Sequence, residues 1–173
     1  MQYTISNNLS LEQANLLKSL EGATLNRIFL DDAGEFALSV FFDSSDNKLV
    51  VKNIPTTQSD GDEYPKLTVE RAVIETQSYR EVVVNKVIKN VLIIRDEASW
   101  QNNNSKWLIH SDIGIKIILE DRELVLLAHD SLAGLIKMID LSETYPDQSE
   151  LFEEYWSMKA DMLESLKREE ISL

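Results

Sequence analysis

Two short triplets contain the residue types in this chain that could do chemistry. The sequence has only two histidines, in "HSD" and "HDS", and each lies beside a serine and an aspartate. Two imidazoles and a carboxylate could hold a divalent metal ion, and a serine, a histidine and an aspartate could form an acyl-transfer site. The catalytic candidates are therefore His110, Asp112, His129 and Ser131.

The segments around these triplets predict a β-hairpin that would bring them together. "GIKIILE" and "ELVLLAHD" alternate apolar residues with a period of two and are joined by the turn "EDRE". A turn centred on residues 121 and 122 places Gly114 opposite His129, and all four candidates then gather at one end of one sheet face. The alternative is that the triplets are ordinary strand ends, where His and Asp often bond to the backbone or water.

No recognised motif supports chemistry at these triplets. The sequence contains no H-E-x-x-H, no G-x-S-x-G and no glycine-rich phosphate loop, and it contains no cysteine. We therefore predict no metal site and no cofactor.

The elements that would position these residues are mostly strands. "LSLEQANLLKSLEG" is the exception and predicts a short N-terminal helix, because Ser10 and Gln13 form a capping box and Gly22 ends the apolar period. From Ala23 the period changes to two, and hairpin-scale turns favour antiparallel pairing. "SWQNNNSKW" is interpreted as a polar loop between Trp100 and Trp107.

The last segment predicts a long amphipathic helix over residues about 147–170. In "QSELFEEYWSMKADMLESLKREE" the apolar residues fall on one broad helical face, and Glu164 and Arg168 are spaced for an i,i+4 ion pair. The fold prediction is therefore α+β: one domain over 1–173, with a mostly antiparallel twisted sheet of about seven to nine strands, a short N-terminal helix and a long C-terminal helix. A partly closed barrel and two similar meanders are the two forms of this sheet that the pattern allows.

A weak internal repeat is one reading of the strand pattern. Residues 24–53 and 87–129 carry similar alternating segments at similar spacing. The alternative is that any two antiparallel meanders resemble one another once gaps are allowed.

Charge limits the partners of the chain. The formal net charge is −13 and the sequence pI is about 4.5, with no basic patch that could neutralise phosphates, so nucleic-acid binding is not expected. The N-terminal residues lack the basic and apolar regions of a signal peptide, and no apolar run is long enough to span a membrane. We expect a cytoplasmic protein.

Three functions remain open at this stage. The first is a non-enzymatic acidic module that binds a protein partner, for example a basic one, as an inhibitor or immunity-type protein does. The second is a small metal-dependent or hydrolytic enzyme that uses the four candidates above. The third is a structural subunit that dimerises through the C-terminal helix. The candidate partner contacts are Trp100, Trp107, Glu153, Glu154, Asp161 and Glu164.

Overall fold

Strands dominate the described part of this protein, with 63% of the described residues in strands and 11% in helices. The computed structural model describes residues 1–33, 36–75, 79–129, 133–142 and 153–173. The helices are α1 (Leu11–Lys18) and the 3-10 helix η1 (Glu153–Met162). The strands are β1 (Gln2–Asn7), β2 (Thr24–Ala33), β3 (Phe36–Ser44), β4 (Lys48–Asn53), β5 (Thr56–Thr57), β6 (Glu63–Tyr64), β7 (Leu67–Arg71), β8 (Arg80–Asn102), β9 (Ser105–Leu119), β10 (Glu123–Ala128), β11 (Ile136–Asp140) and β12 (Ser165–Ser172).

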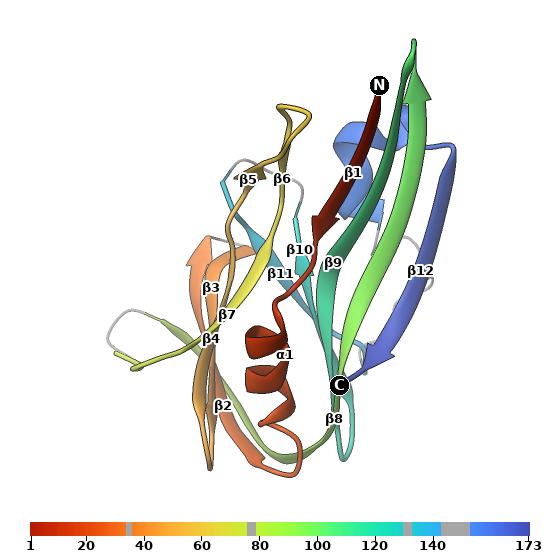
Figure 1. The fold of residues 1–173 in the computed structure, drawn as a ribbon. Helices are drawn as coiled ribbons and strands as arrows, with labels where there is room; N and C mark the ends of the chain where they lie inside the picture. The colour runs from red at the N-terminus through yellow and green to blue at the C-terminus, as the bar shows by residue number, and fades with distance from the viewer. Residues whose placement is uncertain (34–35, 76–78, 130–132, 143–152) are drawn as a thin grey trace.

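Ten of these strands form one large sheet (Figure 1). The hydrogen-bonded neighbours run β8–β2–β3–β11–β10–β9 and return to β8, so the pairings form a closed ring. β4 and β7 extend from β3, and β5 and β6 form a separate small hairpin. β1 and β12 flank the long β8–β9 hairpin. β1 is parallel to β9, whereas the other strand pairs among the described residues are antiparallel.

The predicted α+β class is wrong, because the sheet is larger and the helical content smaller than the sequence suggested. The large sheet contains ten strands instead of about seven to nine, and β5 and β6 form a second, small sheet. The expectation of a large sheet is the part that the structure supports. The two meander segments 24–53 and 87–129 contain β2–β3–β4 and most of β8–β9–β10, but their origin by duplication stays a prediction.

The predicted C-terminal helix over residues 147–170 is also wrong. Residues 147–152 lie outside the described part, residues 153–162 form η1, and β12 then pairs with β8 from Ser165↔Ser99 to Ser172↔Leu92. The predicted apolar face is not buried as a unit, since Met158 is 76% exposed and Leu166 44%. Long-range pairing along the edge of β8 has overridden the local helical pattern.

The N-terminal helix α1 follows the predicted capping chemistry. The Ser10 side chain accepts a hydrogen bond from the Gln13 backbone, and the Gln13 side chain accepts one from the Ser10 backbone. Leu17 and Leu20 are fully buried, and α1 contacts β7 and β8. This capping box is confirmed.

The predicted loop between Trp100 and Trp107 is a tight hairpin. β8 continues to Asn102, β9 begins at Ser105, and the two tryptophans are directly opposite each other. Asn103 takes a φ of 51°, a left-handed conformation that asparagine tolerates better than most residues. Only the turn between Asn102 and Ser105 is therefore unpaired, and the polar residues on either side of it belong to β8 and β9.

The hydrophobic core changes from one face of the β8–β9 hairpin to the other along its length. Near the turn, buried Ala98, Trp100 and Ile109 share the face of Asp96, here called the Asp96 face. Near the other end, buried Ile93 and Ile115 lie on the opposite side, the Asp112 face. The two buried regions meet at the middle of the hairpin.

A β-bulge lies at this crossover. Ile94 pairs with Gly114 and Arg95 with Asp112, so Ile113 is an extra residue in β9. The bulge brings Ser111, Asp112, Ile113 and Gly114 into consecutive buried positions. Polar side chains are thereby buried in the middle of the sheet.

Candidate functional site

Asp96 of β8 is a buried carboxylate held by side chains from the C-terminal segment. It is 0% exposed and pairs in register with Arg168 of β12. Arg168 donates to both carboxylate oxygens, from Nε and from Nη2, each at 2.7 Å, and Trp156 Nε1 donates to Oδ2 at 2.7 Å. This bidentate geometry, with a third donor, neutralises the buried charge and ties η1 and β12 to the sheet.

Ser111 lies beside Asp96 on the same face and joins a chain of hydroxyl contacts. The Tyr155 hydroxyl donates to the Pro65 carbonyl at 2.8 Å and lies 2.5 Å from Ser111 Oγ. Because the Tyr155 proton is used toward Pro65, the Ser111 hydroxyl must donate to Tyr155. Asn7 Nδ2 also donates to the Pro65 carbonyl. Ser111 is therefore a buried donor within a structural network.

Asp112 occupies the opposite face of β9 and binds Arg95. Arg95 Nε donates to Oδ1 at 2.6 Å and Nη2 to Oδ2 at 3.1 Å, while the Leu9 backbone donates to Oδ2 at 2.7 Å. The hydrogen bond to Asp112 raises the pKa of Arg95, although burial opposes this. Asp112 is 1% exposed, and its oxygens already accept three hydrogen bonds.

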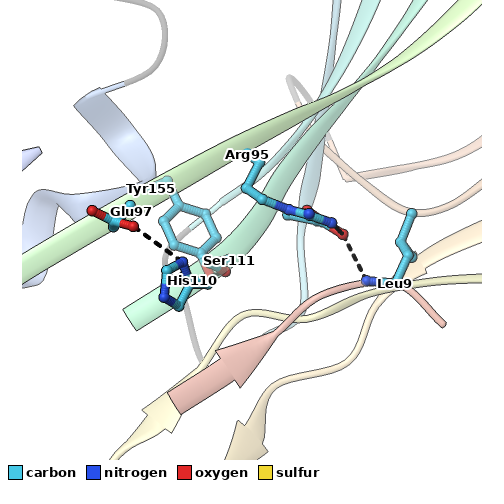
Figure 2. A network of polar contacts seen from close by, with 7 residues as sticks. Leu9, Arg95, Glu97, His110, Ser111 and Tyr155 are labelled. Carbon is cyan, nitrogen blue, oxygen red and sulfur yellow. Dashed lines mark hydrogen bonds and ion pairs between the residues drawn. The ribbon is translucent and has the colours of Figure 1, made fainter. Parts of the chain in front are cut away.

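His110 faces solvent next to this pair. It is directly opposite Glu97 of β8, with Nδ1 3.5 Å from the Glu97 carboxylate. Its side chain is 33% exposed and that of Glu97 49%. Figure 2 shows the imidazole directed toward Glu97, while the Arg95 guanidinium points toward Leu9.

His129 lies at the end of β10 and has other neighbours. Its backbone donates to Leu135 at 2.9 Å, its carbonyl accepts from Asn53 at 3.1 Å, and its ring packs on Phe36 with centroids 4.7 Å apart. The buried Nδ1 has no hydrogen-bond partner among the residues that the structure describes. Ser131 lies outside the described residues.

The predicted hairpin register differs from the observed one by two residues. Gly114 pairs with Leu127 instead of His129, and Leu119 bonds to the Arg122 carbonyl, so the turn is centred on residues 120 and 121. His110 and Asp112 do share a face, but each binds a different partner on β8. Within the described part of the chain, no three His, Asp or Glu residues are grouped to hold a metal ion.

An aromatic cluster covers the Asp96 face near the hairpin turn. Trp100 is 3% exposed and stacks on Trp107 with centroids 5.8 Å apart, and Trp107 stacks on Tyr3 at 5.2 Å. Trp156 contacts Trp100 edge-on at 6.5 Å. Of the two tryptophans proposed as partner contacts, Trp100 thus packs inside the protein and Trp107 is half-buried.

The acidic residues proposed as partner contacts belong to the C-terminal segment. Glu153 and Glu154 are the first residues of η1, and Asp161 and Glu164 are exposed at its far end. The same segment also has exposed apolar side chains. These are Met158, Met162 and Leu166, at 76%, 39% and 44% exposure. Residues 157–166, here called the C-terminal surface, therefore combine carboxylates with apolar groups.

A shallow groove of about 390 Å³ lies between α1 and β7. Its lining combines Ser10, Glu12, Gln13, Leu16, Val69, Glu70 and Arg71. The Arg71 guanidinium is also bonded to Asn47 at 2.8 Å. Neither histidine lies in this groove, so it does not contain the predicted catalytic residues.

Comparisons with protein-family models, curated proteins and solved structures found no match to this chain. In the part of the chain that the structure describes, no helix is long and apolar enough to cross a membrane. The function proposed below is therefore inferred from the structure of this chain.

Proposed function

We propose that this protein is a non-enzymatic binding module for a basic protein partner, and that the C-terminal surface is its contact. The observation that carries this proposal is the exposure of Met158, Met162 and Leu166 next to Asp161 and Glu164. Exposed apolar groups beside charge are typical of protein interaction sites, and carboxylates favour encounter with a basic partner.

The chemistry of the buried polar residues supports binding over catalysis. Asp96 and Asp112 each accept a bidentate arginine, which leaves them poorly suited to act as general bases. Ser111 donates to Tyr155, and His110 is not within hydrogen-bond distance of a serine among the described contacts. These groups hold strands and η1 in place.

The anchoring of the C-terminal segment supports a preformed contact surface. Arg168 and Trp156 fix β12 and η1 to one carboxylate, and Tyr155 fixes η1 to Pro65. A surface held in this way loses little conformational entropy when a partner binds. Covering a basic surface of another protein, as inhibitors and immunity proteins do, is the form of binding that we propose.

Two matched double variants test the location of the contact. Met158→Ser with Glu164→Gln removes one apolar and one acidic group from the C-terminal surface. Leu11→Ser with Glu12→Gln removes the same two types from α1, where Leu11 is 79% exposed. Each protein is immobilised, exposed to lysate of the source cells at about 50 mM and about 500 mM NaCl, and the captured proteins are quantified.

We expect one basic partner to be captured stoichiometrically by the wild type at low salt and by the α1 variant, and to be lost from the C-terminal variant. Equal capture by both variants would contradict the proposed contact. Loss only from the α1 variant would place the contact at the groove between α1 and β7.

A further inference from the structure

Lys159 of η1 is enclosed by two aromatic rings and a carboxylate. Its Nζ lies 4.8 Å from the centroid of Tyr64, 5.6 Å from the centroid of Trp100 and 2.8 Å from Asp62 Oδ2. The lysine side chain is only 14% exposed. An ammonium over aromatic faces and beside a carboxylate is stabilised by the ring quadrupoles and by direct ion pairing.

The two aromatic walls of this cage are held by contacts that do not involve Lys159. The Tyr64 hydroxyl donates to Asp60 Oδ2 at 2.7 Å, and Trp107 Nε1 donates to the same oxygen at 3.0 Å. Trp100 is stacked on Trp107. Tyr64 and Trp100 are 1% and 3% exposed, so both rings are packed in place. The aromatic part of the cage is therefore preorganised for an ammonium group, and the Asp62 side chain, 60% exposed, adds its carboxylate at the rim.

The element that brings Lys159 to the cage is an unusual one. η1 has ten residues, whereas 3-10 helices longer than three or four residues are uncommon because their hydrogen bonds have poorer geometry. Met158 and Asp161, which precede and follow Lys159 in η1, are exposed, whereas the Lys159 side chain is mostly buried. η1 thus crosses the cage and presents one lysine to it.

We propose that Tyr64, Trp100 and Asp62 form a binding site for the ammonium group of a lysine side chain, which Lys159 occupies within the free protein. This inference rests on the proposed function, because a lysine of the basic partner is the ligand that replaces Lys159. The partner's lysine competes with a tethered one, whose effective concentration is high. Binding to the rest of the C-terminal surface supplies the free energy for the exchange.

The test removes the internal ligand and supplies a free one. In Lys159→Ala the cage lacks its ammonium, and n-butylammonium chloride carries the missing alkyl chain and charge. The thermal midpoint is measured at about 100 mM n-butylammonium chloride, NaCl or n-butanol. We expect n-butylammonium to raise the midpoint of this variant by about 3 °C relative to NaCl, with no rise for the wild type or with n-butanol.

A second variant identifies the cage as the binding site. Asp62→Asn in the Lys159→Ala background should abolish the rise, since the ion pair at 2.8 Å is then absent. No rise in a folded Lys159→Ala protein, or an equal rise in the wild type, would overturn the proposal. If Lys159→Ala does not fold, Lys159→Ser is used in the same titration, with the tryptophan indole resonances reporting binding. The titration contains no partner protein, so its outcome is independent of the capture experiment.

Discussion

At the scale of single residues, Asp96 is a carboxylate buried completely within the sheet. Its charge is balanced by Arg168 and supported by Trp156. Such a pair need not stabilise a protein relative to an apolar core, but removal of one partner leaves the other charge uncompensated. Asp96 is therefore the residue that links the C-terminal segment to the sheet.

Substitution Asp96→Asn tests this link. The amide keeps the shape but loses the charge that Arg168 requires, so we expect a loss of about 3–5 kcal/mol in the free energy of unfolding, measured by urea denaturation. Asp161→Asn is the matched control, because its exposed carboxylate should change stability by less than about 0.5 kcal/mol. A loss below about 1 kcal/mol for Asp96→Asn would contradict the assigned role.

Tyr64 gives the clearest pH-dependent prediction. Burial and a hydrogen bond to Asp60 raise the pKa of its phenol far above the usual value of 10. The native state thus retains the proton, and the stability that Tyr64 contributes is complete below pH 10 and lost as the pH rises further. In the folded protein Tyr64 should therefore stay protonated as the pH rises above 10.

An absorbance titration at 295 nm measures this directly. The chain contains five tyrosines. Up to about pH 11 we expect wild type and Tyr64→Phe to show the same increase, because Tyr64 does not contribute to it. A smaller increase in Tyr64→Phe than in the wild type over this range would show that Tyr64 ionises there and would contradict the raised pKa.

At the scale of elements, the sequence predicted what depends on neighbouring residues. The capping box of α1 uses contacts three residues apart, and both were found as predicted. The strands of β9 and β10 were also recognisable from their alternation. These features follow from local periodicity, which the amino-acid types specify directly.

The sequence did not predict the features that depend on contacts between residues far apart in the chain. The segment of β12 has good helix formers, and nothing in it reveals that the edge of β8 and the buried Asp96 lie beside it in the fold. The β9–β10 register was misplaced by two residues because the turn occupies residues 120 and 121. The bulge at Ile113, which buries Asp112, likewise results from long-range pairing. The sequence therefore predicts which types of residue could form a site, but it does not predict which partners they contact.

The connection from β10 to β11 depends on a close approach at Gly134. Its φ is +67°, and an added Cβ would lie 2.3 Å from the Asn53 carbonyl oxygen. Gly22 has a similar φ of +82° but has nothing within 4 Å of an added Cβ. A substitution at Gly22 therefore tests the cost of the left-handed backbone alone, and one at Gly134 tests that cost together with steric overlap.

Alanine substitutions at both positions test this distinction. Gly22→Ala should cost about 1 kcal/mol from the left-handed conformation alone. Gly134→Ala should cost about 2 kcal/mol more, since the Asn53 backbone must move as well. Urea unfolding midpoints measure both changes, and equal losses would argue against the close approach.

β12 is an edge strand, and its charges oppose self-pairing. In a dimer, β12 of one copy would pair antiparallel with β12 of the other copy across a two-fold axis. Because residues opposite each other in such a pair lie on the same face of the sheet, one residue of β12 must then lie opposite its own copy. At the centre of the strand this residue is Arg168 or Glu169, and like charges directly opposite are destabilising. The third function, dimerisation through a C-terminal helix, also loses its basis because that helix is absent from the described residues.

We therefore expect no dimer through β12. Light scattering at about 100 μM should give the mass of one chain, 19.8 kDa. A dimer mass together with slowed deuterium exchange in residues 165–172 would contradict this prediction.

At the scale of the whole molecule, the net charge is consistent with the proposed binding of a basic partner. The chain carries a formal charge of −13, and two of its basic side chains, Arg95 and Arg168, are bound to buried carboxylates. Such a surface accelerates encounter with basic proteins and does so less at high salt. The large sheet provides the rigid support on which η1 and the beginning of β12 are displayed.

The C-terminal surface is the proposed contact with the partner. Backbone deuterium exchange of this protein, measured with and without the captured partner, tests it most directly. We expect slower exchange in residues 157–166 on complex formation and unchanged exchange in α1. Protection confined to α1 and β7, with residues 157–166 unchanged, would contradict it.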